Sequence, residues 1–337
     1  METGEATAPV WHGGDIGAAR RLFPHAPEPW VDLSTGINPV PYPVGPLPNA
    51  AFRQLPAPED VLALEEIAAQ AYGASDPAHV VAAPGTQVLI SLLPYLFPAG
   101  RVAVLGPTYA EHALCWTHAG HEVELVRQTE KLVAADIAIV VNPNNPDGRR
   151  LTPENLQELA RVLAAHRGWL VLDEAFVDFE PELSLVPHLP ENAVVLRSFG
   201  KTYGLAGVRL GFAVSQGAAL AQRIRSRLGP WAISGPALAV GQLALADLPW
   251  RSHAAGARME EARRLDALMA PLLGAPVGGT ALFRTFSSPR AAEVFNLLGA
   301  AGIFVRRFAD DPRMLRLGLP GTEQKWSRLG EAMQAAA

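Results

Sequence analysis

Lys201 stands out because lysine is scarce in this chain. Of the 28 Lys and Arg residues, only Lys131, Lys201 and Lys325 are lysines. Lys201 lies in "RSFGKTYGLAGVRLGF", three residues after Ser198 and eight before Arg209. A lysine amine forms Schiff bases with carbonyl compounds once its pKa is lowered or a charged partner is near, and a hydroxyl with a guanidinium can hold one phosphate. The stretch indicates either a solvated surface lysine or a nucleophilic amine beside a phosphate site.

Other polar residues follow apolar runs. Asp173 ends "WLVLD", where an unpaired carboxylate would be costly to bury. Three interpretations of Asp173 remain open: a helix cap, one member of a structural ion pair, or the partner of a pyridinium nitrogen. Asn145 lies in "NPNNPDG", and most such turns have no other role. Gly85 and Thr86, in "APGTQ", precede a predicted helix whose free amides could bind an anion, although a plain helix start has the same pattern.

The elements that must position these residues alternate between strands and helices. Short β-branched runs such as "RVAVL", "DIAIVV" and "AVVLRSF" recur between about residues 80 and 214, with helical stretches at 110–118 and 153–165. This order predicts a mainly parallel sheet covered on both faces. Ligands bind at the carboxyl ends of such strands. Asn145, Asp173 and Lys201 follow three of these runs, so we expect them to meet at one edge.

The chain divides into three predicted regions. Residues 1–55, rich in Pro and Gly, form an irregular N-terminal arm that contributes to the small domain and the active site. Residues 56–235 form the large domain, which opens with a helix at "PEDVLALEEIAAQAYG". Residues 236–337 comprise a long helical zone to about residue 273 and a smaller α+β domain with strand-like "TALFRTF", "GIFVRRF" and "MLRLGLP".

Composition narrows the possible functions. The chain has 337 residues, 49% hydrophobic and 18% charged, with a net charge of −5 that argues against a nucleic-acid binder. A single cysteine, Cys115, excludes an intrachain disulfide and a cysteine-based zinc site. The nine histidines show no metal-ligand spacing, so we expect no metal. With no apolar run long enough to cross a membrane and no visible secretory signal, we expect a soluble, cytoplasmic protein without a membrane partner.

Together, "PGTQ", "NPNNPDG", "DEAF" and "SFGKTYGLAGVRLG", in this order and spacing, resemble the fold-type I pyridoxal-phosphate enzymes, and within them the histidinol-phosphate aminotransferase branch. The N-terminal "HGGD" and "LSTGINPVPYP" are similar to the threonine-phosphate decarboxylases of cobalamin biosynthesis. The resemblance covers nearly the whole chain. It implies pyridoxal 5'-phosphate as cofactor, a seven-stranded sheet between helices in the large domain, and a homodimer with the active site at the subunit interface.

The resemblance also implies a role for each matched residue. Lys201 would hold the cofactor covalently and move protons at the substrate Cα, Asp173 would pair with the pyridine nitrogen, and Tyr109 would stack on the ring. The expected cofactor ligands are Gly85, Thr86, Tyr109, Asn145, Asp173, Ser198, Lys201 and Arg209. The expected substrate ligands are His12, Gly13, Thr35, Gly36, Asn38, Arg306 and Arg316, with Arg316 on the carboxylate. Arg306 and Arg307 are adjacent on a predicted strand and would face opposite ways, so one of them would be solvated.

Two departures from the aminotransferase pattern bear on the reaction. Phe176, in "DEAF", stands where aminotransferases of this branch usually carry tyrosine, and Leu55 aligns with a tyrosine that reaches the neighbouring subunit's cofactor phosphate. We therefore expect decarboxylation of L-threonine O-3-phosphate to (R)-1-aminopropan-2-yl phosphate. The alternatives are an aminotransferase for a phosphorylated substrate such as histidinol phosphate, and a non-catalytic protein that keeps the fold as a binding scaffold.

Overall fold

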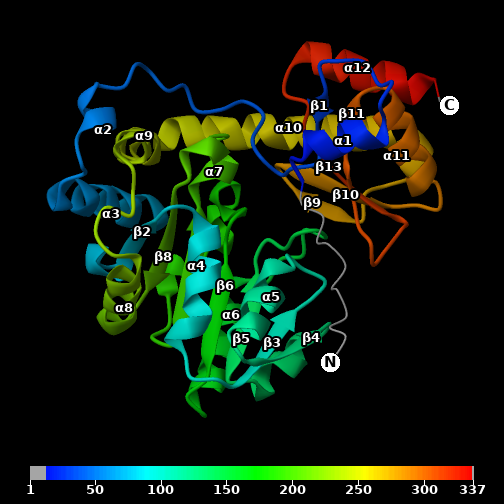
Figure 1. Cartoon of the computed structure of the whole chain (residues 1–337). Helices are drawn as coiled ribbons and strands as arrows, with labels where there is room; N and C mark the ends of the chain where they lie inside the picture. The colour runs from blue at the N-terminus through cyan, green and yellow to red at the C-terminus, as the bar shows by residue number, and fades with distance from the viewer. Residues whose placement is uncertain (1–12, 336–337) are drawn as a thin grey trace, which may run out of the picture.

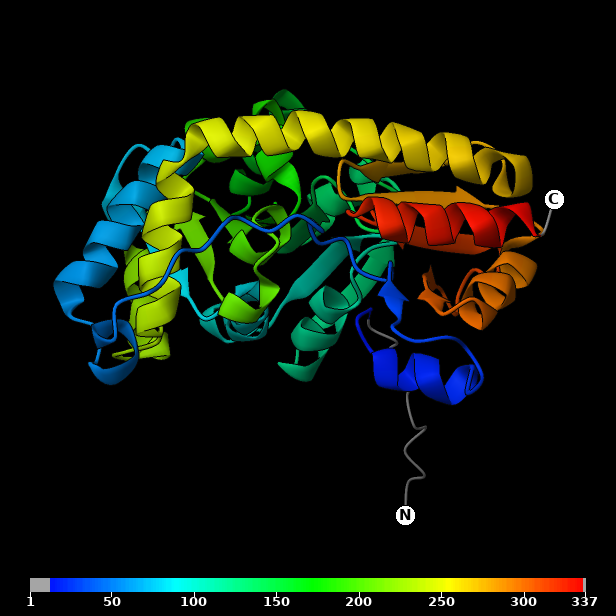
Figure 2. The ribbon, with the colours of Figure 1, turned by 90° about the horizontal axis from the view of Figure 1, so that it is seen from above.

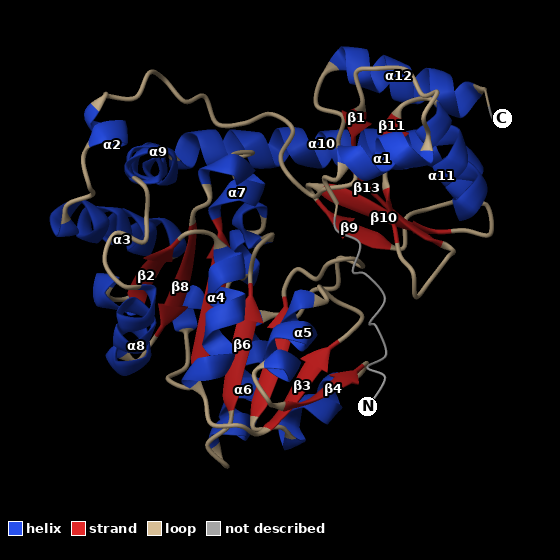
Figure 3. Ribbon diagram, in the orientation of Figure 1, coloured by secondary structure: helices blue, strands red, loops and turns tan. Residues whose placement is uncertain are grey.

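The computed structural model describes residues 13–335. Two sheet-containing domains lie side by side beneath one long helix, α10 (Leu248–Leu273), which reaches from one to the other (Figure 1). The large domain carries the sheet seen at the centre of Figure 3, and the small domain carries the C-terminal strands. The space between the domains is therefore bounded by elements far apart in the sequence.

The large domain is built on a seven-stranded sheet, as predicted. Its strands are β2 (Val80–Ala83), β3 (Arg101–Leu105), β4 (Glu122–Val126), β5 (Ile137–Val141), β6 (Trp169–Asp173), β7 (Ala193–Ser198) and β8 (Gly211–Ser215). Their spatial order is β2-β8-β7-β6-β5-β3-β4. β8 runs antiparallel to both neighbours, whereas the pairs from β7 through β4 are parallel. The mainly parallel α/β fold is confirmed.

Helices cover both faces of this sheet because successive strand residues point to opposite sides. On β6, Leu172 joins one buried cluster and Val171 another, and Val195 and Val194 of β7 divide in the same way. The helices of this domain are α2 (Ala50–Arg53), α3 (Pro58–Tyr72), α4 (Thr86–Leu92), α5 (Glu111–His118), α6 (Pro153–Ala164), α7 (Phe199–Thr202), α8 (Ala218–Leu228) and α9 (Gly235–Ala246). The sheet is therefore packed against a hydrophobic core on each face. These two cores hold in place the strand ends near which Asn145, Asp173 and Lys201 lie.

The small domain differs from its prediction in detail. Its strands are β9 (Gly278–Thr280), β10 (Phe283–Ser287), β11 (Ile303–Phe304), β12 (Arg306–Arg307) and β13 (Met314–Gly318), and its helices are α11 (Ala291–Ala300) and α12 (Glu323–Gln334). "TALFRTF" is two strands rather than one, because the Thr280 hydroxyl accepts from the Leu282 amide at 3.1 Å and closes a turn. The long helical zone is two helices, because the Asp247 carboxylate caps α10 by accepting from the Trp250 amide.

The N-terminal arm touches both domains. Its helix α1 (Ile16–Leu22) precedes β1 (Val31–Asp32), which pairs in parallel with β11 of the small domain. The chain then crosses the molecule to reach α2 beside the large domain (Figure 2). The arm therefore runs from the small domain to the large domain (Figure 2).

Within residues 13–335, no helix combines the length and apolarity needed to cross a membrane. The same part of the chain holds no cluster of three or more His, Cys, Asp or Glu side chains suited to a metal ion.

Candidate active site

A cavity of about 520 Å³ lies where the large domain, the small domain and the arm meet. The large domain supplies Gly85, Thr86, Tyr109, Asn145, Asp173, Ser198, Lys201 and Arg209, the arm supplies Gly13, Thr35 and Gly36, and the small domain supplies Arg306 and Arg316. Every predicted site residue among the described ones, except Asn38, lines this cavity. His12 lies outside the described residues.

One end of the cavity is a cradle of backbone and cationic groups. Gly85 has φ +87°, and a Cβ there would lie 2.9 Å from the Arg209 guanidinium. A Cβ on Gly211, which pairs with Ser198 across β7 and β8, would lie 2.7 Å from the Thr86 amide nitrogen. Neither glycine has room for a side chain, so the Arg209 guanidinium and the start of α4 pack closely against them, and Thr86, Ser198 and Arg209 all line the cavity. This donor set suits a phosphate.

Lys201 lies between this cradle and the small domain. Burial lowers the pKa of its amine to about 8, and repulsion from Arg316 and Arg209 acts in the same direction while Asp173 opposes it. Its Nζ lies 5.5 Å from the centre of the Phe176 ring. An amine with such a pKa is partly unprotonated near neutral pH, which is the state that a nucleophile needs.

Asp173 is held by a histidine that the sequence analysis did not identify. The carboxylate is 4% exposed, and its Oδ2 lies 2.9 Å from Nε2 of His112, which is also buried. Its Oδ1 accepts from the Ala175 amide at 3.0 Å. His112 lies at the start of α5, three residues after Tyr109, and no sequence pattern pointed to its pairing with Asp173. The pairing itself depends on the strand order, which places the β3 loop near β6.

Tyr109 presents its ring to the cavity with its hydroxyl anchored. The hydroxyl donates to Gln87 Oε1 at 3.1 Å, and Gln87 Nε2 donates to Glu111 at 3.2 Å. Burial, with the nearby carboxylates Glu111 and Asp173, raises the pKa of the phenol to about 12, so the ring is neutral at neutral pH. Gln87 is a second residue that the sequence analysis did not single out.

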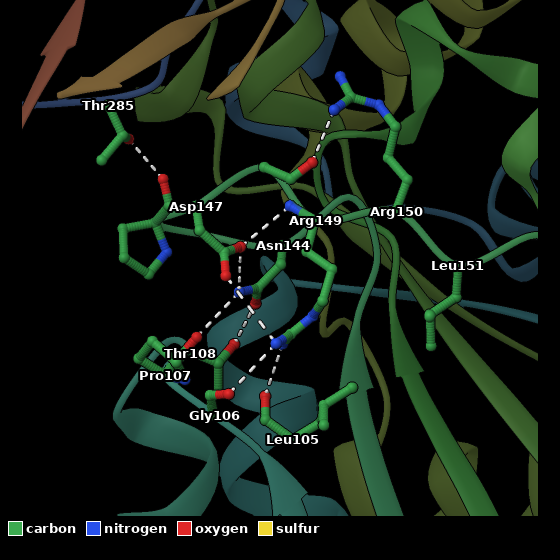
Figure 4. A network of polar contacts seen from close by, with 12 residues as sticks. Leu105, Gly106, Pro107, Thr108, Asn144, Asp147, Arg149, Arg150, Leu151 and Thr285 are labelled. Atoms are coloured by element: carbon green, nitrogen blue, oxygen red, sulfur yellow. Dashed lines mark hydrogen bonds and ion pairs between the residues drawn. The ribbon is translucent and has the colours of Figure 1, made fainter. Parts of the chain in front are cut away.

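A polar network fixes the turn that carries Asn145 (Figure 4). Asn144 accepts from the Thr108 hydroxyl at 2.6 Å and donates to Asp147 at 2.7 Å, which ties the turn to the loop after β3. From the small domain, the Thr285 hydroxyl donates to the carbonyl of the residue after Asn145. The turn "NPNNPDG" thus does more than reverse the chain, because it joins the two domains beside the cavity.

Arg316 is a buried cation at the other end of the cavity. It is 7% exposed; Nη1 donates to Asn145 Oδ1 and Nη2 donates to the Ser34 carbonyl at 2.7 Å. Its Nε has no hydrogen-bond partner within residues 13–335. Burial and the charge of Arg306 lower the pKa of its guanidinium to about 9, and attraction to the Asp32 carboxylate only partly opposes them. Buried charges are normally paired. Arg316 therefore suits an anionic ligand.

The two adjacent arginines of β12 differ. Arg306 is half-buried, and burial lowers the pKa of its guanidinium, while its charge in turn lowers the pKa of Arg316. Arg307 is exposed, and its guanidinium lies 4.4 Å from the centre of the Phe295 ring on α11. Both arginines line the cavity, and Arg306 is the one whose charge acts on Arg316.

Asn38 lies elsewhere than the sequence analysis expects. It is 2% exposed and outside the cavity lining, and its Nδ2 donates to the Thr202 carbonyl at 2.8 Å. In contrast, Thr35 and Gly36 face the cavity, and a Cβ on Gly36 would lie 2.8 Å from Phe283. The arm turns away from the cavity between Gly36 and Asn38.

The lysine with its lowered pKa, the cradle suited to a phosphate, and the buried carboxylate held by His112 fit pyridoxal phosphate. The sheet is that of the fold-type I enzymes, which use this cofactor. The sequence model for aminotransferase class I and II matches residues 49–329. The chain belongs to this family.

Two curated relatives span almost the whole chain. A threonine-phosphate decarboxylase of Pseudomonas aeruginosa is 40% identical over 96% of this chain and 96% of its own length. One of Sinorhizobium sp. is 42% identical over 97% of this chain and 98% of its own length. Among solved structures, the L-threonine-O-3-phosphate decarboxylase of Porphyromonas gingivalis superposes with a TM-score of 0.75 at 20% identity, covering 90% of this chain and 98% of that one. That likeness shows the fold alone.

Proposed function

We propose that this protein decarboxylates L-threonine O-3-phosphate to (R)-1-aminopropan-2-yl phosphate, with pyridoxal 5'-phosphate as cofactor. The observation that carries the proposal is the buried Arg316, whose Nε has no partner among the described residues, facing the cavity opposite a separate phosphate cradle. A cofactor phosphate would fill the cradle, and a second anion is needed for Arg316. The two relatives of 40% and 42% identity are named for this substrate.

The residues present fit the cofactor in detail. Gly85, Thr86, Ser198 and Arg209 would hold its phosphate, Asn145 would donate to its ring oxygen, and Tyr109 would lie on its face. Asp173, fixed by His112, would keep a proton on the ring nitrogen. When bound, the cofactor supplies an electron sink for the pair left on the substrate Cα.

The chain's own residues then control which bond breaks. Arg316 would bind the substrate carboxylate, and Arg306 with the arm residues Gly13, Thr35 and Gly36 would bind the substrate phosphate. His12 belongs to this phosphate group in the proposal. Holding a substrate at both ends fixes the torsion about Cα, so that the bond to the carboxylate is the one aligned for cleavage. That bond breaks, CO₂ leaves without the electron pair, and Lys201 Nζ donates a proton to Cα.

The test is to incubate the purified protein, saturated with cofactor, with L-threonine O-3-phosphate. We expect one CO₂ and one aminopropanol phosphate per substrate consumed, with no need for a keto acid. An absence of CO₂ from fully loaded protein would refute the proposal. An aminotransferase would instead need a keto-acid acceptor and would release no CO₂, so the same assay with and without 2-oxoglutarate separates the two reactions.

A covalent assay tests the lysine separately from turnover. Reduction with borohydride followed by peptide mass spectrometry should find the cofactor mass on the peptide that contains Lys201. In Lys201→Ala, the covalent adduct and the absorbance band that depends on it should both be absent. A wild-type protein that stays colourless and unlabelled with excess cofactor would support the non-catalytic scaffold.

The proposal includes a homodimer in the cytoplasm. The homodimer is supported by exposed apolar side chains at one end of the large domain: Phe52 of α2 is 66% exposed, Leu55 69% and Leu243 of α9 57%. α2 packs on the start of α9, since a Cβ on Gly235 would meet the backbone of Ala51. Light scattering should give twice the chain mass of 35.9 kDa, and Phe52→Glu should lower it. A monomeric wild type would refute this part alone.

A further inference from the structure

The turn that carries Lys201 is held from outside by the arm. α7 has four residues, so its last carbonyls lack partners within the helix. The Lys201 carbonyl accepts from the Gly204 N–H at 3.3 Å within the turn, and the arm supplies further donors. The Asn38 backbone N–H donates to the Lys201 carbonyl at 2.9 Å, and Asn38 Nδ2 donates to the Thr202 carbonyl at 2.8 Å. Four residues further along the arm, the Tyr42 N–H donates to the Tyr203 carbonyl at 2.9 Å.

A glycine makes this close approach possible. Gly204 has φ +65°, and a Cβ there would lie 2.5 Å from the Asn38 carbonyl oxygen and 2.8 Å from Pro41 Cα. Gly204 therefore leaves room for the backbone of the arm. The Tyr42 ring adds an edge-on contact to Tyr203, with 6.2 Å between centroids. Lys201 is thus followed by a turn whose backbone is packed and hydrogen-bonded to the arm.

The other side of the Asn38 amide is also occupied. Its Oδ1 accepts from the Val40 N–H at 3.1 Å and from Arg258 Nη1 at 3.2 Å. Arg258 comes from the long helix α10, is 6% exposed, and pairs with Glu261 at 2.8 Å. Both acceptor positions of the amide oxygen are used. Asn38 therefore has neither the exposure nor a free acceptor to serve a ligand in the cavity.

The same short segment is tied to the substrate end of the cavity. The Gly318 N–H donates to the Leu33 carbonyl at 2.7 Å, and Arg316 Nη2 donates to the Ser34 carbonyl at 2.7 Å. Thr35 and Gly36 then line the cavity. A stretch of five residues, Ser34 to Asn38, therefore runs from the arginine proposed for the substrate carboxylate to the backbone of the lysine turn.

We propose that Asn38 is a positioning residue for Lys201. It closes the C-terminal end of α7 and joins that turn to α10 through Arg258, so that the amine keeps its place while the substrate is held by the neighbouring part of the arm. The effect on turnover rests on the proposed decarboxylase function. The effect on the turn itself does not.

Hydrogen–deuterium exchange of the cofactor-free protein tests the structural part. In Asn38→Ala, amides in the peptide covering residues 199–205 should exchange roughly 5- to 100-fold faster, the range expected when a buried hydrogen-bond partner is lost. Asn192→Ala is the matched control, because Asn192 Nδ2 also donates to backbone carbonyls, those of Ala160 and Gly168 at 2.9 Å each. It should leave the 199–205 peptide unchanged. Equal exchange in wild type and Asn38→Ala would overturn the proposal.

Kinetics separate positioning from substrate binding. A misplaced lysine should lower kcat by roughly 10- to 100-fold, while KM for the phosphorylated substrate changes by less than about threefold, because no substrate contact is lost. A residue that binds the substrate phosphate would instead raise KM and leave exchange at 199–205 unaltered. That result would return Asn38 to the role expected from the sequence.

A second variant guards against misfolding. Asn38→Asp keeps oxygens that accept from Val40 and Arg258 but has no amide donor for the Thr202 carbonyl. It should fold and reproduce both the faster exchange and the lower kcat. If Asn38→Asp shows the exchange rate and kcat of the wild type, the proposal that Asn38 positions Lys201 is refuted. If the wild type releases no CO₂, the exchange experiment still decides whether the arm holds this turn.

Discussion

The two ends of the cavity are built in different ways. The cofactor end uses loops at the edge of one sheet, from Gly85 to Arg209, and each loop follows a strand buried in two cores. The substrate end is assembled from the arm and from β12 and β13, which meet only in the folded molecule. The cofactor end is therefore a property of one domain, whereas the substrate end depends on how the domains and the arm are placed.

In the proposed function, the first end binds the cofactor and the second end selects the substrate. Phe176 lies at the boundary, with its ring 5.1 Å from that of Phe283 in the small domain and 5.5 Å from Lys201 Nζ. It offers no hydroxyl to the cofactor. Lys201 is influenced from both ends, since Arg209 and Arg316 both lower its pKa. Variants at both ends test how separate they are.

The largest expected effect is on the protonation of Lys201 in the cofactor-free protein. Its pKa of about 8, against an ordinary value of 10.5, reflects burial first and Arg316 second. Competitive acetylation followed by mass spectrometry should show half-maximal labelling near pH 8, with the exposed Lys131 and Lys325 as references in the same sample. Arg316→Met should raise this midpoint by removing a like charge, and Asp173→Asn should lower it. A wild-type midpoint at or above 10 would contradict the prediction.

The same shift has a consequence for stability. The unfolded chain holds the Lys201 proton up to about pH 10.5, whereas the folded chain releases it near pH 8. Between these values the unfolded state binds more protons, so stability rises with pH across this window. Below pH 8 the full cost of the buried charge is present. Cofactor-free Lys201→Met should therefore be more stable than wild type at pH 7 in denaturant unfolding, and this advantage should shrink toward pH 10.5.

The next effect separates the two arginines. Arg209→Met should weaken cofactor binding by about 10- to 100-fold, the loss expected for a charge-assisted hydrogen bond to phosphate. At saturating cofactor, its KM for substrate should change little. Arg316→Met should do the reverse, raising KM by a similar factor with little effect on cofactor affinity. Absorbance titration of the cofactor and initial rates measure the two constants. If both variants weaken the same constant, the two ends are not separate.

The contrast between the ends also explains how much could be predicted from sequence. The strands, the parallel sheet and the loops of Gly85, Asn145, Asp173 and Lys201 followed from apolar runs and the polar residues after them. Such signals are local, and parallel strands necessarily bring their carboxyl ends together. The resemblance to known enzymes added roles for these residues, and the structure places all of them around one cavity.

What could not be predicted depended on tertiary contacts. His112 lies on a helix, and only the order of β3, β5 and β6 brings it to Asp173. Asn38 was grouped with the substrate ligands because the resemblance of "LSTGINPVPYP" to known decarboxylases implied that role. The chain direction changes within two residues, so the amide reaches the Thr202 carbonyl instead. Neither hydrophobic periodicity nor residue type contains this information.

The smallest expected effect concerns the neighbouring arginines of β12, which offer an internal control. Arg306→Met should raise KM for L-threonine O-3-phosphate by about tenfold, because the substrate phosphate would lose a half-buried guanidinium near Arg316. Arg307→Met should change KM by less than about twofold, since its guanidinium lies over Phe295. Measuring each variant also with unphosphorylated L-threonine isolates the phosphate contribution, and Arg306→Met should reduce the preference for the phosphorylated substrate. A larger loss of preference in Arg307→Met would reverse the assignment and place the phosphate on the α11 side of β12.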